Sequence, residues 1–255
     1  MPTVRPFIVA ACFLLLVIAH AQETTVWTVA CVNCGQFHYG DKKTAPEDYR
    51  RRWQKLFADV DADVFFMEDN SSDFPFNTIR FPKFDIRANA SRTPISASIV
   101  KLTREIDGHK SPRYRVFRLV YDINGKSVAF YGMHLVAEGH IHVKMAEGEK
   151  YSLSQKLRQT QFQELINDAK QFDGVVFTGD FNAQIPAEYD VFKQNGYTLS
   201  NCSETYGTTA TLRDIPADNI IVSPWIKILE FKILQNYNLD TDHFPLVAKL
   251  QFSQD

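Results

Sequence analysis

The sequence is poor in the residues that mark fibrous and irregular proteins. Its 255 residues include only 11 glycines and 11 prolines, whereas 45% are hydrophobic and 13% are aromatic. This balance excludes collagen-like, low-complexity and intrinsically disordered chains. Charge of one sign is also scarce, because 28 Lys and Arg stand against 30 Asp and Glu, a formal net charge of −2. A protein that coats DNA through a strongly basic surface is therefore not expected, and the length suits one large core.

The motifs of several large enzyme classes are missing as well. The sequence contains no P-loop, no G-x-S-x-G turn and no H-E-x-x-H helix. It therefore gives no indication of a P-loop nucleotide hydrolase, an α/β-hydrolase or a zincin. Internal repeats, heptads and low-complexity segments are absent too.

Long apolar runs are missing except at the amino terminus. Residues 6–18 form an apolar run behind Arg5, and Ala19-His20-Ala21 follows it. A basic start, about a dozen apolar residues and an A-x-A end are typical of a secretory signal peptide, whereas a transmembrane helix needs about 20 apolar residues. We predict a signal peptide over 1–21, one domain over 22–255, and a secreted protein without stable insertion in a membrane. A buried helix or an uncleaved anchor is the alternative interpretation of the same run.

Cysteine is scarce too. Cys12 lies in the predicted signal peptide, which leaves Cys31, Cys34 and Cys202. Three thiols allow one disulfide, for which Cys34–Cys202 is the preferred pair. Cys31 and Cys34 form a C-x-x-C, but the helical pattern of a thioredoxin-like site does not follow it. Three N-x-S/T sequons, which matter only in a eukaryotic host, are present at Asn70, Asn89 and Asn201.

Strand-like and helix-like patterns alternate along the chain. Apolar, β-branched and aromatic runs predict strands over 25–32, 62–67, 95–102, 114–120, 127–134, 174–178, 219–222, 226–234 and 246–252. Asn124-Gly125 between two of these runs is a strong hairpin signal. Apolar residues at helical spacing predict amphipathic helices over about 46–60 and 152–169, the second opening on a capping box of Ser152 and Gln155. Strands outnumber helices, which favours a two-sheet α/β sandwich.

Polar residues gather where the predicted strands end. Each of them alone is typical of a turn or a helix cap, but sites in layered α/β folds lie where strands stop and loops begin. Carboxylate and amide oxygens select Mg²⁺, Mn²⁺ or Ca²⁺ over zinc, and such a cation beside imidazoles suits the hydrolysis of a phosphate ester. The residues concerned are Asn33, Glu68, His134, Asp180, Asn182, Asp218, Asp242 and His243.

The order and spacing of these residues resemble the endonuclease/exonuclease/phosphatase superfamily, which includes deoxyribonuclease I-like enzymes. Gly179-Asp180-Phe181-Asn182 and Asp242-His243-Phe244-Pro245-Leu246 carry the likeness, which extends from about Val26 to Phe252. The resemblance implies a four-layer α/β/β/α sandwich with two mostly antiparallel or mixed sheets facing each other. It also implies that 22–255 is a catalytic domain with its site at one end of the sheets.

The resemblance further implies which residues hold a metal and organise the attack. Glu68 would be the main ligand of Mg²⁺, or of Mn²⁺ or Ca²⁺ in its place, assisted by Asn33 and Asp242. Asp180 would orient or deprotonate the attacking water, and Asn182 would hold the phosphate.

The histidines take the remaining roles in the same resemblance. His243, positioned by Asp218, would bind or polarise the phosphoryl group or act as the base. His134 would contact the phosphate or help the leaving group depart. Arg158 and Gln161 match a helix pattern of the family that we take as structural.

Four residues next to the proposed ligands depart from the family pattern, namely Val32, Met67, Met133 and Thr241. None of them removes a ligand, so they bear on the subfamily and not on the chemistry of the site. The sequence thus predicts a monomeric, metal-dependent phosphoesterase. Because His134 resembles the deoxyribonuclease and sphingomyelinase pattern, a phosphodiester is favoured, with nucleic acid first and a phospholipid head group second. An inositol-phosphate-like phosphatase and a non-catalytic binding module that keeps the fold are the alternatives.

Overall fold

The computed structural model describes residues 24–34, 46–68, 79–80, 87–111, 115–137, 147–202, 209, 215–239 and 241–253. They form two six-stranded sheets and a two-stranded ribbon. The first sheet has the order β13-β14-β1-β2-β4-β3, with β1 (Thr25–Asn33), β2 (Val64–Glu68), β3 (Ile79–Arg80), β4 (Arg87–Ala90), β13 (Ile226–Ile233) and β14 (Leu246–Phe252). The second has the order β11-β12-β10-β9-β8-β5, with β5 (Ser96–Ile99), β8 (Arg115–Ile123), β9 (Lys126–His134), β10 (Gly174–Asp180), β11 (Thr198–Leu199) and β12 (Asp218–Val222). The ribbon pairs β6 (Glu105–Ile106) with β7 (His109–Lys110).

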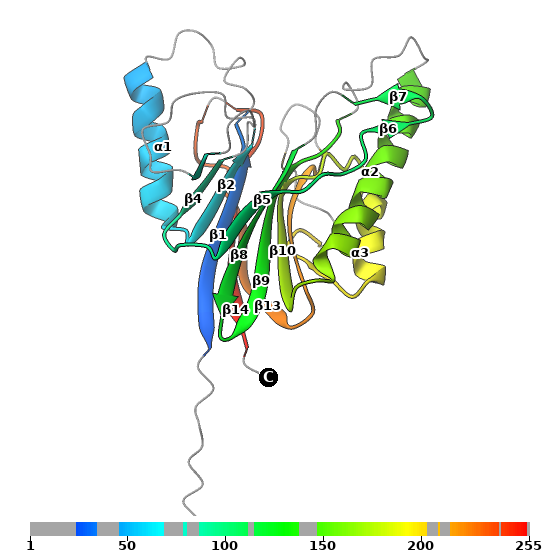
Figure 1. Ribbon diagram of the computed structural model, residues 1–255. Helices are drawn as coiled ribbons and strands as arrows, with labels where there is room; N and C mark the ends of the chain where they lie inside the picture. The colour runs from blue at the N-terminus through cyan, green and yellow to red at the C-terminus, as the bar shows by residue number, and fades with distance from the viewer. Residues whose placement is uncertain are drawn as a thin grey trace, which may run out of the picture.

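Helices cover the outer faces of both sheets, which gives the molecule four layers (Figure 1). α1 (Pro46–Val60) lies on one flank, and α2 (Glu147–Ala169) lies on the other with the short α3 (Asp190–Gln194). A 3-10 helix, η3 (Pro186–Tyr189), leads into α3. The predicted α/β/β/α sandwich is therefore confirmed. Among the described helices, none has the length and apolar character that a membrane crossing requires.

Alternation along the strands explains the layers. In β1, Val29 and Cys31 belong to the core between the sheets, whereas Ala30 and Val32 join the core beneath α1. Successive side chains of a strand point to opposite faces, so a central strand of this sandwich must be apolar on both. By the same alternation Asn33, two residues after Cys31, belongs to the face between the sheets.

The predicted hairpin at Asn124-Gly125 is confirmed. β8 and β9 pair antiparallel, and Asn124 and Gly125 have φ angles of 58° and 77°. A type I′ turn requires such left-handed values at both central residues. Thr25 pairs with Phe252, and Thr25 Oγ1 donates to Asn124 Oδ1 at 2.7 Å. The turn therefore closes the end of the sandwich at which β1 begins and β14 finishes.

Two local predictions give the right kind of element with the wrong bounds. The run at 95–102 forms a strand only over Ser96–Ile99, at the edge of the second sheet, where Ile95 and Ile99 are 67% and 38% exposed. An apolar run does not reveal whether another strand covers it. α2 begins at Glu147, so Ser152 lies inside the helix and not at its cap.

The predicted bridge between Cys34 and Cys202 is also wrong. None of the three cysteines in the described ranges forms a disulfide. Cys34 is buried at the end of β1 in the first sheet, whereas Cys202 is exposed beyond β11 at the edge of the second. Asn201 is buried and its backbone N–H is held by Asn219 Oδ1, so it is no accessible acceptor for a glycan. Asn70 and the predicted signal segment 1–21 lie outside the described residues.

Candidate active site

Strand register brings five of the predicted site residues to one end of the sandwich. In the first sheet, Asn33 stands opposite Glu68 in the parallel pair β1–β2. In the second sheet, Asp180 stands between His134 on the parallel neighbour β9 and Asp218 on the antiparallel neighbour β12. Because β1, β2, β9 and β10 end here and β12 begins here, five chain segments contribute to a single cluster.

Asp180 lies at the centre of this cluster. Asn33 Nδ2 donates to Asp180 Oδ2 at 2.8 Å, and this bond links the two sheets. The same oxygen lies 3.6 Å from His134 Nε2 and 3.9 Å from His243 Nε2. The other oxygen accepts the backbone N–H of Asn182 at 2.7 Å. The carboxylate is thus fixed in position between two imidazole rings.

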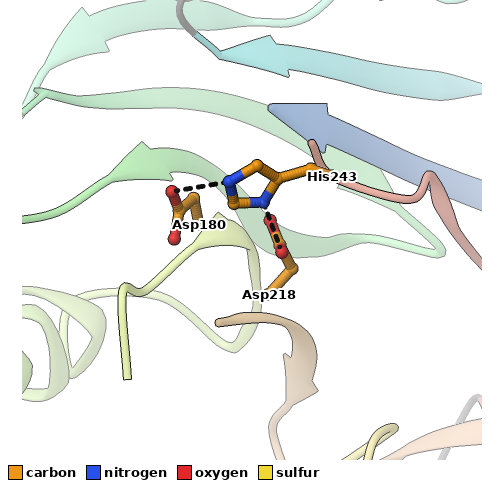
Figure 2. A group of neighbouring side chains, drawn as sticks. All are labelled: Asp180, Asp218 and His243. Atoms are coloured by element: carbon orange, nitrogen blue, oxygen red, sulfur yellow. Dashed lines mark hydrogen bonds and ion pairs between the residues drawn. The ribbon is translucent and has the colours of Figure 1, made fainter. Parts of the chain in front are cut away.

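Asp218 orients His243. His243 Nδ1 donates to Asp218 Oδ2 at 2.8 Å, so that Nε2 faces Asp180 across the ring (Figure 2). Burial alone would lower the pKa of His243, but the charge and hydrogen bond of Asp218, together with Asp180 and Asp242, raise it to about 10. The neighbouring carboxylates therefore favour the imidazolium form, which offers an N–H donor at Nε2.

Glu68 approaches the cluster from the other sheet. Its side chain is buried, and a Cβ added at Gly179 would meet Glu68 Oε1 at 2.6 Å. Gly179 also has a φ of 121°, which residues with a side chain rarely adopt. The turn before Asp180 and the close approach of Glu68 therefore both require glycine at this position.

Cys31 lies in the core between the sheets, close to Glu68 and Asp218. Burial raises the pKa of the Cys31 thiol well above its ordinary value, and the charges of these two carboxylates raise it further. Because the thiolate is the reactive form of cysteine, the geometry gives no support to a redox role for Cys31 and Cys34.

The loop after Asp180 is held to the segment that follows His134. Asn182 has a left-handed φ of 54° and donates from Nδ2 to Leu135 O at 3.0 Å. Leu135 N in turn donates to Asp180 O at 2.9 Å. His134 and Asn182 are each 7% exposed. Asn182 therefore lies beside Asp180 and His134 with one amide N–H already engaged by the protein.

Asp242 lies at the rim of the cluster. Its side chain is 24% exposed, and its Oδ1 is 3.9 Å from His243 Nε2. Thr241 fastens this segment, because its hydroxyl donates to Asn33 O at 2.6 Å and accepts the N–H of His243 at 3.2 Å. The sequence marks Thr241 only as a departure from the family pattern, although its place directly before Asp242 is the signal that could have revealed this function.

A divalent cation fits the donors of the site. The carboxylates of Glu68, Asp180 and Asp218 are all buried at this end of the sandwich, and buried anions need compensation by cations or hydrogen-bond donors. Ligand atoms of Asp180, Asp218 and His243 lie within 4.8 Å of one another. The Asp218–His243 bond already uses one ligand atom of each of these two residues. Glu68, the predicted main ligand, is not one of these three residues, and its role as a ligand stays a prediction.

Comparisons with known proteins identify the architecture. No family model and no curated protein matches the sequence. An endonuclease/exonuclease/phosphatase from Beutenbergia cavernae has a TM-score of 0.65 and 14% identity over 89% of this chain and 72% of its own. ANGEL2, a 2',3'-cyclic phosphatase in complex with adenosine-2',3'-vanadate, has a TM-score of 0.62 and 15% identity over 90% and 96%. D. rerio TDP2 complexed with a single-strand DNA product has a TM-score of 0.59 and 13% identity over 89% and 99%. This chain has the endonuclease/exonuclease/phosphatase fold.

The endonuclease/exonuclease/phosphatase fold accounts for the layout of the site. In this fold two sheets face each other, so residues at adjoining strand ends of both sheets meet in space even when the sequence separates them widely. The resemblance that the strand-end residues predicted is confirmed at the level of the fold. At identities of 13–15% the shared architecture does not carry an activity from one chain to another, which has to be argued from the side chains.

Proposed function

We propose that this chain is a divalent-cation-dependent phosphoesterase that hydrolyses phosphodiester bonds, with nucleic acid as the favoured substrate. The observation that carries the proposal is the position of Asp180, whose Oδ2 lies 3.6 Å and 3.9 Å from the Nε2 atoms of His134 and His243. One carboxylate between two imidazoles provides a proton acceptor and proton donors around a single point, as general acid–base hydrolysis requires.

Each side chain then has a distinct task. Asp180, held by Asn33 and the backbone of Asn182, orients the attacking water and accepts its proton. His243, held as a cation by Asp218, donates from Nε2 to a phosphoryl oxygen. His134 assists the leaving oxygen from the other side of Asp180. Glu68, with Asn33 and Asp242, would hold a divalent cation, which would supply further neutralisation of the phosphoryl charge.

Two observations favour nucleic acid over a lipid head group. ANGEL2 and D. rerio TDP2, which share the fold, are described in complex with an adenosine-2',3'-vanadate and a single-strand DNA product.

We also propose that residues 1–21 direct export, because they combine an apolar run with an A-x-A end. We propose further that the chain acts as a monomer.

The test is a panel of substrates assayed with purified protein in Mg²⁺ and in EDTA. We expect hydrolysis of single- or double-stranded DNA or RNA in Mg²⁺, and its loss in EDTA. Glu68→Ala and His243→Ala should both abolish it, whereas Asp122→Asn, at the far hairpin, should not. Turnover of sphingomyelin or phosphoinositides without cleavage of nucleic acid would reject the nuclease assignment. Activity that survives both site substitutions would reject the mechanism, and no turnover of any substrate would favour a non-catalytic module.

A further inference from the structure

A fully buried ion pair lies behind the site on the second sheet. Arg158 of α2 donates from Nε to Glu188 Oε2 at 2.8 Å and from Nη2 to Glu188 Oε1 at 3.1 Å. Both side chains are 0% exposed. Replacing such a pair by apolar residues of similar volume is often neutral or stabilising, because the cost of desolvating two charges offsets their attraction. Stability alone therefore does not explain why charges stand here.

The arginine end of the pair reaches the segment that follows His134. Arg158 Nη1 donates to Val136 O at 3.1 Å, two residues after His134. Leu135, between them, donates its N–H to Asp180 O at 2.9 Å. The guanidinium thus limits how far the end of β9 can move relative to Asp180.

The glutamate end reaches the loop that carries Asn182. Glu188 Oε1 accepts the N–H of Gln184 at 2.8 Å, and Gln184 Nε2 donates to Asn182 O at 3.1 Å. Asn182 then returns to the other segment through its bond to Leu135 O. The contacts form a closed ring that begins and ends at Arg158, and it holds Asn182 in its left-handed conformation of φ 54°.

We propose that Arg158 and Glu188 are positioning residues that set His134 and Asn182 against Asp180 for phosphodiester hydrolysis. The inference rests on the proposed function of the same site. A planar guanidinium can hold a carboxylate with two parallel bonds and a carbonyl with a third, which a lysine ammonium cannot reproduce. The pair therefore acts on the reaction through the two loops and not by touching the substrate.

The test separates positioning from stability. The double variant Arg158→Met with Glu188→Leu keeps an apolar pair of similar volume but removes the bonds to Val136 O and from Gln184 N, so its melting temperature should fall only slightly. Its kcat should fall by roughly 10²-fold, the effect expected of a misplacement of about 1 Å, while KM changes little. Arg158→Lys keeps the charge, should fold, and should still lose most of this rate.

The matched control is an ion pair between α2 and β8 of the second sheet. Arg118 Nη1 donates to Asp168 Oδ2 at 2.6 Å. This pair takes no part in the ring of hydrogen bonds that links Arg158 and Glu188 to the segments of His134 and Asn182. Arg118→Met should lower the melting temperature and leave kcat within twofold of the wild type. A folded double variant, or a folded Arg158→Lys variant, with wild-type kcat would overturn the inference.

A readout independent of turnover distinguishes failure of the inference from failure of the proposed function. The side-chain ¹⁵N resonances of His134 and Asn182 should shift in Arg158→Lys, and those of His109 on the β6–β7 ribbon should not. Unchanged resonances of His134 and Asn182 contradict positioning even if the wild type hydrolyses nothing. If these resonances shift in Arg158→Lys while the wild type shows no phosphodiesterase activity, the positioning role stands and the proposed function is rejected.

Discussion

The two ends of the space between the sheets have opposite chemistry. At the end where β1 begins, aromatic rings fill it: Trp27 stacks on Phe130 with centroids 5.4 Å apart and meets Tyr121 edge-on at 5.0 Å. At the other end, where β1 finishes, buried carboxylates, amides and imidazoles replace the aromatic rings. Asn33, one of these amides, lies only six residues after Trp27 on the same strand. One end is rich in apolar area and the other in desolvated charge, so we expect stability and activity to reside at opposite ends of one core.

The largest expected effect is on activity at the polar end. His243→Ala removes the donor at Nε2 and leaves Asp218 buried beside a cavity. We expect the rate of phosphodiester hydrolysis to fall by roughly 10²–10⁴-fold, the range for loss of a general acid or base. Steady-state kinetics at a temperature where both proteins are folded measure this change. Asp122→Asn, an exposed carboxylate next to the distal turn, is the control, and a His243→Ala rate within threefold of the wild type would contradict the assignment.

The next effect is on stability at the aromatic end. Trp27→Ala should lower the free energy of unfolding by about 3–5 kcal/mol, because it removes a buried indole that contacts three other rings. Denaturant titration followed by circular dichroism measures it. Activity per folded molecule should stay at the wild-type level, and a specific loss of turnover in the folded variant would show that the two ends are coupled.

A cation should stabilise the polar end. At a free concentration of 100 times its dissociation constant, Mg²⁺ should raise the free energy of unfolding by about 2.7 kcal/mol. Glu68→Gln should lose most of this gain because it removes the proposed main ligand. Thermal melts in EDTA and in increasing MgCl₂ measure both proteins, with Glu230→Gln, at a half-buried carboxylate on β13, as the control. An equal response to Mg²⁺ in wild type and Glu68→Gln would exclude Glu68 as the ligand.

The smallest effect concerns the fastening of the His243 segment. Thr241→Val removes two hydrogen bonds of the hydroxyl, one donated to Asn33 O and one accepted from His243 N. Their loss should lower the free energy of unfolding by about 1–2 kcal/mol. Turnover should fall as well, because His243 loses its tie to β1. Thr241→Ser keeps the hydroxyl and should behave as the wild type. Equal turnover in the valine and serine variants would remove Thr241 from the account.

Much of the site could be predicted, because its residues stand at the ends of strands that the apolar pattern of the sequence reveals. Asn33, Glu68, His134 and Asp180 each terminate a run whose apolar pattern is clear, and parallel pairing of β1 with β2 and of β9 with β10 brings those ends together. The assignment of metal ligands is harder to derive. Which carboxylates can share a cation depends on the approach of two sheets, and the contact of Glu68 with Gly179 joins residues 111 positions apart.

Other features leave too little signal in a sequence. The two-residue strands β3, β6, β7 and β11 span a single period of alternation, so no repeating pattern marks them. A motif such as Ser152-x-x-Gln155 does not fix where a helix begins, because α2 starts five residues earlier at Glu147. The bond of Arg158 to Glu188 joins α2 to the 3-10 helix η3, 30 positions away, and spacing along the chain contains no trace of it.

The central claim is tested most directly at Asp180, where both sheets and both histidines meet. Asp180→Asn keeps the size of the side chain and removes one of the buried charges. The rate of phosphodiester hydrolysis in Mg²⁺ and the free energy of unfolding in EDTA should be measured on the same preparation. We expect a variant at least as stable as the wild type whose rate is lower by roughly 10²-fold or more. A folded Asp180→Asn protein that cleaves phosphodiesters at the wild-type rate would contradict the account.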